Sequence, residues 1–255
     1  MRGLKGKVAV VAGGAGGIGT ATSIRLAEEG ARVVVADLDE KSARGVVDEI
    51  TERGGTAIAF AFDIGQESDV AALVAAAVGE FGGLDILHAN AADLSPTTIG
   101  QDSDATQIPL EVFDRTMHVN VRGHLLCARH ALPHLVERGG GALVFTSSAA
   151  AFAGEPERPA YAIAKSGINA LVRHIASRWG KEGVRANAVA PGLVLTAPVR
   201  DSLNDEFRQR VLRGTRSPRL GTPEDVAAMV AFLASDDGQW VNGQVINVDG
   251  GSILR

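Results

Sequence analysis

Short apolar, β-branched runs alternate with longer segments of helical period along the whole chain, and this alternation constrains the fold more than any other feature. It is typical of a parallel sheet covered by helices on both faces. Several runs are apolar throughout, as expected of strands buried on both faces. We therefore predict an α/β fold, a doubly wound seven-stranded parallel sheet. The expected strands are Lys7–Ala12, Arg32–Asp37, Thr56–Phe62, Leu84–Ala89, Ala142–Thr146, Arg185–Ala190 and Gln244–Val248.

Helix signals stand between these runs. Thr222, followed by Pro223 and Asp225, predicts an N-cap, a proline at the first helical position and an acidic first turn. Earlier helices with a start or stop signal are expected at Ile18–Glu29, Glu40–Arg53 and Ser68–Phe81. Because no linker or charge run divides the chain, we expect residues 1–255 to form a single dinucleotide-binding and catalytic domain.

Two segments interrupt the alternation. Ala91–Pro109 is polar and rich in Gly, Pro, Ser and Asp, and it is longer than a usual connection, so it is either functional or mobile. Leu193–Ser217 holds a helical patch, Asn204–Leu212, between Pro198 and Pro218. A mobile lid over a pocket has this pattern, so a substrate lid is expected over about residues 193–217.

Charge and cysteine content exclude several classes of protein. The 25 Lys and Arg residues against 30 Asp and Glu residues give a net charge of -5, which leaves little attraction for nucleic acid. No apolar run is long enough to span a membrane. The single cysteine, Cys127, is consistent with a reducing cytoplasm. No metal is expected, because His130 and His134 are separated by Pro133 and no third ligand follows.

A glycine-rich turn follows the first expected strand and precedes a helix. In this context glycines let the backbone approach a pyrophosphate at a helix N-terminus, as in a Rossmann domain. The turn fits one glycine pattern through Gly14, Gly16 and Gly19, and another through Gly13, Gly17 and Gly19. The turn alone therefore predicts a dinucleotide site without naming a family.

Asp37 ends the second expected strand, 18 residues after Gly19. An acidic side chain at this spacing accepts hydrogen bonds from the hydroxyls of the adenosine ribose. A 2′-phosphate would be repelled by the carboxylate, and the turn from Gly13 to Gly19 contains no Lys or Arg to offset the repulsion. These residues predict NAD as the cofactor, although Asp37 is also placed to act as a turn or cap residue.

Tyr161 is the only tyrosine of the chain, and Lys165 follows four residues later, so both side chains share one helix face. A phenol with a pKa near 10 is a poor base at neutral pH. A neighbouring ammonium is expected to lower that pKa. Thr146, Ser147 and Ser148 close the fifth strand, at the sheet edge where doubly wound folds bind ligands.

With these residues the chain resembles the short-chain dehydrogenase/reductase family over essentially its whole length, in its NAD-using branch. The resemblance implies an active site of Asn120, Ser148, Tyr161 and Lys165. It implies cofactor contacts at Gly13, Gly17, Ile18, Gly19, Asp37, Asp63, Ile64, Asn90, Tyr161, Lys165, Pro191, Gly192, Val194 and Thr196. Two positions depart from the family pattern, since Ala12 stands where Thr is usual and Ala89 where Asn is usual.

The resemblance also implies a chemistry. Tyr161 would act as general base or acid while hydride passes to or from NAD, Ser148 would hydrogen-bond the reacting oxygen, and Asn120 would hold a water that links Lys165 to solvent. The expected function is an NAD-dependent interconversion of a secondary alcohol and a ketone. The alternatives are an NADPH-dependent 3-oxoacyl reductase and a non-catalytic NAD-binding protein.

The expected assembly also comes from the resemblance. Family members usually associate as homotetramers through two long helices, here Leu110–Arg138 and Ala160–Lys181. No partner other than a small alcohol or ketone is expected.

Overall fold

A computed structural model describes residues 1–202 and 204–254. Its strands form one parallel sheet in the order β3-β2-β1-β4-β5-β6-β7, so the predicted doubly wound fold is confirmed. The order reverses between β1 and β4, and ligands bind at such a switch point. The strands are β1 Val8–Ala12, β2 Arg32–Asp37, β3 Thr56–Ala61, β4 Ile86–Ala89, β5 Gly141–Thr146, β6 Val184–Pro191 and β7 Val245–Val248.

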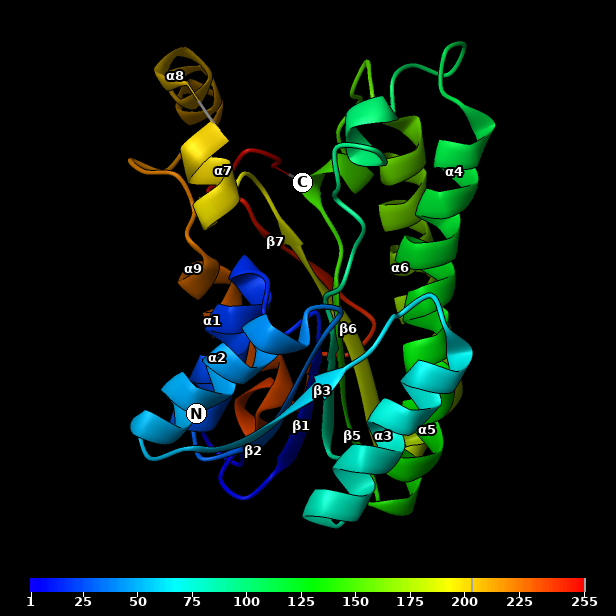
Figure 1. Cartoon of the computed structure of the whole chain (residues 1–255), viewed down its shortest axis with the longest axis vertical. Helices are drawn as coiled ribbons and strands as arrows, with labels where there is room; N and C mark the ends of the chain where they lie inside the picture. The colour runs from blue at the N-terminus through cyan, green and yellow to red at the C-terminus, as the bar shows by residue number, and fades with distance from the viewer. Residues whose placement is uncertain (203, 255) are drawn as a thin grey trace.

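Helices cover both faces of the sheet (Figure 1). One face carries α1 (Gly17–Glu28), α2 (Glu40–Glu52) and α9 (Pro223–Ala234). The other carries α3 (Glu67–Phe81), α4 (Leu110–Met117), α5 (Gly123–Glu137) and α6 (Pro159–Trp179). Two short helices, α7 (Ala197–Ser202) and α8 (Asp205–Gly214), stand beyond the carboxyl ends of the strands, opposite α4 and the upper part of α6 (Figure 1).

The central strands of the sheet lie inside the core. Val8, Val10, Val33 and Val35 are fully buried, because helices cover both faces of the central strands. Even-numbered residues of β1 pack toward α3 and α5, and odd-numbered ones pack toward α1 and α2. The carboxyl edge of the sheet is therefore held rigidly where the ligand site is expected.

The predicted strands are all present, with ends that differ by no more than two residues. Asp85, just before β4, accepts hydrogen bonds through its carboxylate from the Val8 N–H and from Lys7. The expected Leu110–Arg138 helix is interrupted by a π turn, His118–Arg122. The N-cap predicted at Thr222 is confirmed, with Pro223 at the start of the helix and Asp225 in its acidic first turn.

Among residues 1–202 and 204–254, no helix combines the length and the apolar character needed to cross a membrane.

Candidate active site

One cavity of about 1830 Å³ opens along the carboxyl ends of the strands. Its wall runs from the glycine-rich turn, past Asp37 at one end, to Ser148 and Tyr161 at the other. The helices α7 and α8 contribute Pro198 and Phe207. The tertiary fold thus joins the two predicted sites, for the dinucleotide and for catalysis, in one continuous space.

The glycine-rich turn packs closely against its neighbours. Gly13 has a φ of +81°, and its N–H and that of Gly14 both donate to the Ala36 carbonyl at 2.8 Å. A Cβ on Gly17 would lie 2.4 Å from the Thr196 methyl group, whereas one on Gly16 would meet nothing within 4 Å. The turn is therefore tight on its protein side and open on its cavity side.

Gly19 differs from the other predicted glycines because it does not line the cavity. A Cβ there would lie 1.8 Å from the Gly13 carbonyl oxygen. In this structure Gly19 lets α1 pack against the turn, and its direct contact with a cofactor stays a prediction.

Asp37 connects β2 to the glycine-rich turn. Its carboxylate accepts a hydrogen bond from the Ala15 N–H at 3.0 Å and from the Asp39 N–H at 3.3 Å. The wall beside it is formed by Leu38, Asp39 and Ser42. Among the described residues that line the cavity, the Lys and Arg side chains are Arg115, Arg158 and Lys165, and none of them comes from this β2 end.

A buried hydrogen-bond chain anchors the turn to the middle of the sheet. The Asn90 amide donates to the Gly13 carbonyl at 2.9 Å and accepts from the Thr146 hydroxyl at 3.0 Å. The His88 ring nitrogen Nε2 lies 2.9 Å from the same hydroxyl, and burial lowers the His88 pKa to about 3, so this ring is neutral and donates. The chain anchors the turn although Ala12 has no hydroxyl.

The candidate catalytic side chains converge from β5 and α6. Ser148 follows the end of β5, and Tyr161 is the third residue of α6, with Lys165 one turn further on. All three line the cavity, and a hydrogen bond joins Tyr161 and Ser148. Lys165 is buried, its ammonium lies 5.6 Å from the centre of the Tyr161 ring, and it donates to the Thr146 carbonyl at 2.7 Å.

The expectation that the pKa of Tyr161 is lowered is wrong in this geometry. Burial raises the pKa of the phenol above 10, and the hydrogen bond with Ser148 only partly opposes this effect. The Lys165 ammonium donates to the Thr146 carbonyl, and its charge does not outweigh the effect of burial on the phenol. Burial instead lowers the pKa of Lys165 to about 8. The neutral phenol is thus the stable form at neutral pH, and it suits proton donation.

Asn120 lies on the π turn behind the cavity wall and is fully buried. Its side-chain oxygen accepts from the Asp93 N–H at 2.9 Å. Its Nδ2 has no acceptor among the described residues, although buried amides normally have one. A bound water is the usual partner for such a group.

The remaining predicted cofactor residues, other than Gly19, line the cavity: Ile18, Asp63, Ile64, Asn90, Pro191, Gly192, Val194 and Thr196. Sequence reasoning missed Phe62, which lies just before Asp63, and the α4 residues Glu111 and Arg115. It also missed Ser252 and Ile253, which return to the cavity from the C-terminal segment. No motif marks these positions, because they reach the wall only through the path of the chain.

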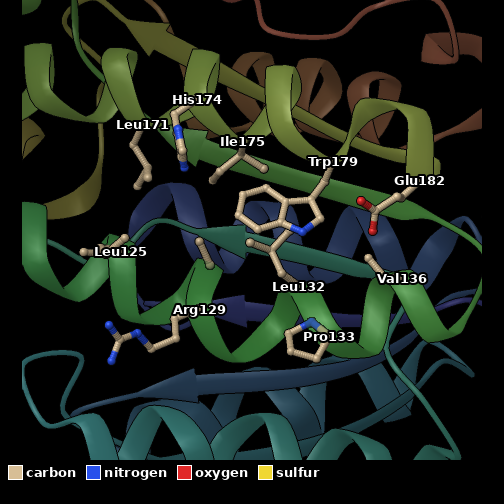
Figure 2. A pocket seen from close by; sticks show the side chains of 11 residues that line it. Leu125, Arg129, Leu132, Pro133, Val136, Leu171, His174, Ile175, Trp179 and Glu182 are labelled. Carbon is tan, nitrogen blue, oxygen red and sulfur yellow. The ribbon is translucent and has the colours of Figure 1, made fainter.

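A second, smaller hollow of about 440 Å³ lies between α5 and α6 and has no lining residue in common with the large cavity (Figure 2). Figure 2 shows the Trp179 indole lying between the two helices, above Leu132 and Pro133. Arg129 and Glu182 stand at its rim. Because its wall is mainly aliphatic and aromatic, we interpret it as a packing surface.

The large cavity fits an extended ligand with phosphate groups. The N-cap residue of α1, Gly16, has no side chain to cap the helix, which leaves its first backbone N–H groups available to a phosphate. Asp37 at the β2 end offers carboxylate oxygens to sugar hydroxyls. The Ser148, Tyr161 and Lys165 group stands at the far end, where a reacting centre would lie.

Known proteins are similar to this chain in sequence and in fold. Residues 13–252 match the model of a family described as enoyl-(acyl carrier protein) reductase. A probable short-chain type dehydrogenase/reductase of Bradyrhizobium diazoefficiens is 42% identical over 251 residues, which cover 98% of this chain and 89% of that protein. The 7alpha-hydroxysteroid dehydrogenase of Bacteroides fragilis is 33% identical over 255 residues, covering 100% of this chain and 97% of that one.

A solved structure of a 7alpha-hydroxysteroid dehydrogenase, in complex with NADH and 7-oxo glycochenodeoxycholic acid, superposes with a TM-score of 0.92. It is 34% identical in sequence, and the match covers 100% of this chain and 96% of the solved chain. The glycine-rich turn, the Ser148, Tyr161 and Lys165 group and these full-length similarities agree, and the chain belongs to the short-chain dehydrogenase/reductase family.

Proposed function

We propose that this protein is an NAD-dependent oxidoreductase that interconverts a secondary alcohol and a ketone. The observation that carries the proposal is the position of Ser148, Tyr161 and Lys165 on the wall of the cavity that also contains the glycine-rich turn and Asp37. A protein that only bound a dinucleotide would not need a phenol held against a serine hydroxyl.

The assignment of NAD as the cofactor depends on the end of the cavity that contains Asp37. NAD, when bound, supplies or accepts the hydride. Asp37 disfavours a 2′-phosphate by charge repulsion, and none of the described Lys and Arg side chains that line the cavity lies at that end. The bound NADH of the 7alpha-hydroxysteroid dehydrogenase structure supports the same choice.

Tyr161 transfers the proton. In ketone reduction its neutral phenol donates the proton to the carbonyl oxygen, and in alcohol oxidation the same oxygen removes the hydroxyl proton. Ser148 hydrogen-bonds the reacting oxygen, and the Lys165 ammonium stabilises the phenolate that forms. Asn120 holds a water that passes protons toward solvent, which its buried, unpartnered Nδ2 supports.

The walls around the reacting end suggest a mostly apolar substrate. Leu94, Ala149 and Val199 contribute aliphatic surface there. Two arginines of the wall are paired with carboxylates, since Arg115 donates to Asp93 and Arg158 to Glu155. We propose a small or medium-sized alicyclic or aliphatic ketone and its alcohol as the substrate class, with residues 193–217 as the lid.

The enzyme is proposed to act in the cytoplasm as a homotetramer. The single cysteine, Cys127, is buried and free, and burial raises its thiol pKa to about 12, so it is an inert core residue suited to a reducing compartment. The mainly apolar hollow between α5 and α6 supports association through these two helices.

The test is hydride transfer, followed by the absorbance of the reduced nicotinamide. Purified protein is offered NADH or NADPH with a panel of ketones that includes a 7-oxo bile acid, and NAD with the matching alcohols. Turnover that favours NADH and is lost in Tyr161→Phe supports the proposal. NADH binding without turnover of any panel member would favour the non-catalytic alternative, and a preference for NADPH with 3-oxoacyl thioesters would favour the acyl reductase.

A further inference from the structure

The long loop between β4 and α4 (residues 90–109) reaches across to the helix that carries Tyr161. The buried carboxylate of Asp102 accepts hydrogen bonds from the Ala160 N–H at 3.1 Å and from the Tyr161 N–H at 2.8 Å. Helix α6 begins with Pro159, which has no N–H, so these two are its first backbone donors. One side chain, 59 residues away in sequence from Tyr161, thus caps the start of α6.

The residue before the helix is fixed by the same loop. Arg158 has a φ of +65°, the one described non-glycine residue in the left-handed region. Its N–H donates to the carbonyls of Asp102 and Ser103 at 3.0 and 2.8 Å. A left-handed conformation costs energy for an arginine, and the loop's two carbonyls hold it in place.

The other end of the loop contacts a second active-site residue. The Asp93 N–H donates to the Asn120 side-chain oxygen at 2.9 Å. The Asp93 carboxylate is held in turn by Arg115 at 2.9 Å and Thr98 at 3.1 Å. Between these two anchors, residues 93–99 line the cavity wall where substrate is proposed to lie.

We propose that Asp102 is a positioning residue for Tyr161, and that the β4–α4 loop is a fixed brace that links the substrate wall to the phenol. This inference rests on the proposed function for its catalytic meaning. Tyr161 is the third residue of α6, so the backbone that Asp102 holds is the backbone that sets where the phenol oxygen lies relative to Ser148 and Lys165. A displacement of about 1 Å at such a group can lower a rate about 100-fold.

The chain offers a direct readout, because Tyr161 is its only tyrosine. The ultraviolet absorbance of tyrosinate during a pH titration therefore reports this phenol alone, with no need for substrate. The groups that affect its ionisation are Ser148, Arg158 and Glu155, with Lys165 over the ring. The charge of Asp102 is not among them, so a change caused by an Asp102 variant reports altered burial of the phenol.

The experiment compares Asp102→Ala and Asp102→Asn with Asp104→Ala. Asp104 is the matched control, since it lies in the same loop but its carboxylate accepts hydrogen bonds from Thr106 and Gln107, within the loop itself. In folded Asp102 variants the phenol should titrate closer to the free value of about 10. The kcat for NADH-dependent reduction of a panel ketone should fall at least about 10-fold, with a smaller change in the KM for NADH.

The outcomes separate the possibilities. A folded Asp102 variant that is less stable but keeps the wild-type titration and kcat has lost only a helix cap, and the proposal is then wrong. An equal effect of Asp104→Ala would contradict it too. If Asp102→Ala does not fold, Asp102→Asn decides, because its one side-chain oxygen still accepts one of the two N–H groups. If no ketone is reduced by the wild type, the proposed function fails while the titration still decides the role of Asp102.

Discussion

Lys165 and Tyr161 share one helix face, but their environments affect their pKa values in opposite directions. Burial lowers the Lys165 pKa to about 8 and raises that of Tyr161 above its usual 10. The ammonium is therefore present below about pH 8 and lost above it, while the phenol stays neutral through this range. The group that titrates near neutral pH is thus the lysine.

This order predicts the pH profile of ketone reduction. In the wild type kcat should be constant below about pH 8 and fall as the pH rises through it. Lys165→Arg should have a lower kcat, but this kcat should not fall near pH 8, since a guanidinium stays charged. Tyr161→Phe should lose at least ~100-fold in kcat and still bind NADH. A fall of kcat near pH 8 that persists in Lys165→Arg would contradict the assignment of this ionisation to Lys165.

Asp37 is the residue expected to set the cofactor preference. The wild type should show kcat/KM for NAD at least about tenfold above that for NADP, about 1.4 kcal/mol. Asp37→Ser should bring this ratio closer to one, because it removes the repulsion of the 2′-phosphate. Most of the change should come from weaker binding of NAD, since the acceptor for the ribose hydroxyls is lost as well. Asp48→Ser is the control and should leave the ratio unchanged, since Asp48 is an exposed carboxylate of α2 that does not line the cavity. Equal kcat/KM for both cofactors in the wild type would refute the prediction.

At the scale of elements, α9 supports the glycine-rich turn by packing against α1 on the same face of the sheet (Figure 1). The start of α9 is fixed by Asp225, which accepts from the Thr222 N–H at 2.8 Å and from Arg219 at 2.6 and 2.7 Å. These bonds lower the Asp225 pKa to about 2. A carboxylate whose pKa is lower in the folded state stabilises the protein above the unfolded value near 4 and loses that effect as the pH falls toward 2.

We therefore expect Asp225→Ala to lower the free energy of unfolding by about 1–2 kcal/mol at pH 7, the range for a lost cap with a solvent-screened ion pair. The loss should shrink as the pH falls from about 4 toward 2. The measurement is urea unfolding at one fixed protein concentration. Glu224→Ala, in the same first turn but exposed, is the control and should change little. An equal loss in both variants would count against the capping role.

At the scale of the whole molecule, the hollow between α5 and α6 predicts an interface. Leu125 at its edge is 46% exposed, and Leu171 and Trp179 extend the apolar surface across both helices. We expect light scattering to give about four times the 26.4 kDa chain mass. Leu125→Glu should lower that mass, whereas Thr51→Glu on the exposed side of α2 should not. A wild-type mass near that of one chain would refute the prediction.

The parallel sheet could be predicted from the amino-acid sequence, and so could most residues of the candidate site. Periodicity and buried apolar runs are local properties, so the strands around Val10 and Val34 were predictable. The glycine-rich turn, Asp37, Ser148, Tyr161 and Lys165 were likewise marked by spacing, because each stands at a strand end or on one helix face. The residue types at such places directly indicate which chemical groups are available.

The environment of these groups depends on tertiary packing and could not be predicted from their spacing. This packing directed Lys165 at the Thr146 carbonyl and buried the Tyr161 phenol, which reversed the expected pKa shift. It also placed Asp102 under the start of α6. Such effects depend on burial and on contacts between residues far apart in the chain, and electrostatic energies change with burial far more than with sequence spacing. A local pattern therefore names the chemical groups, and the packing of distant segments sets how they ionise and where they lie.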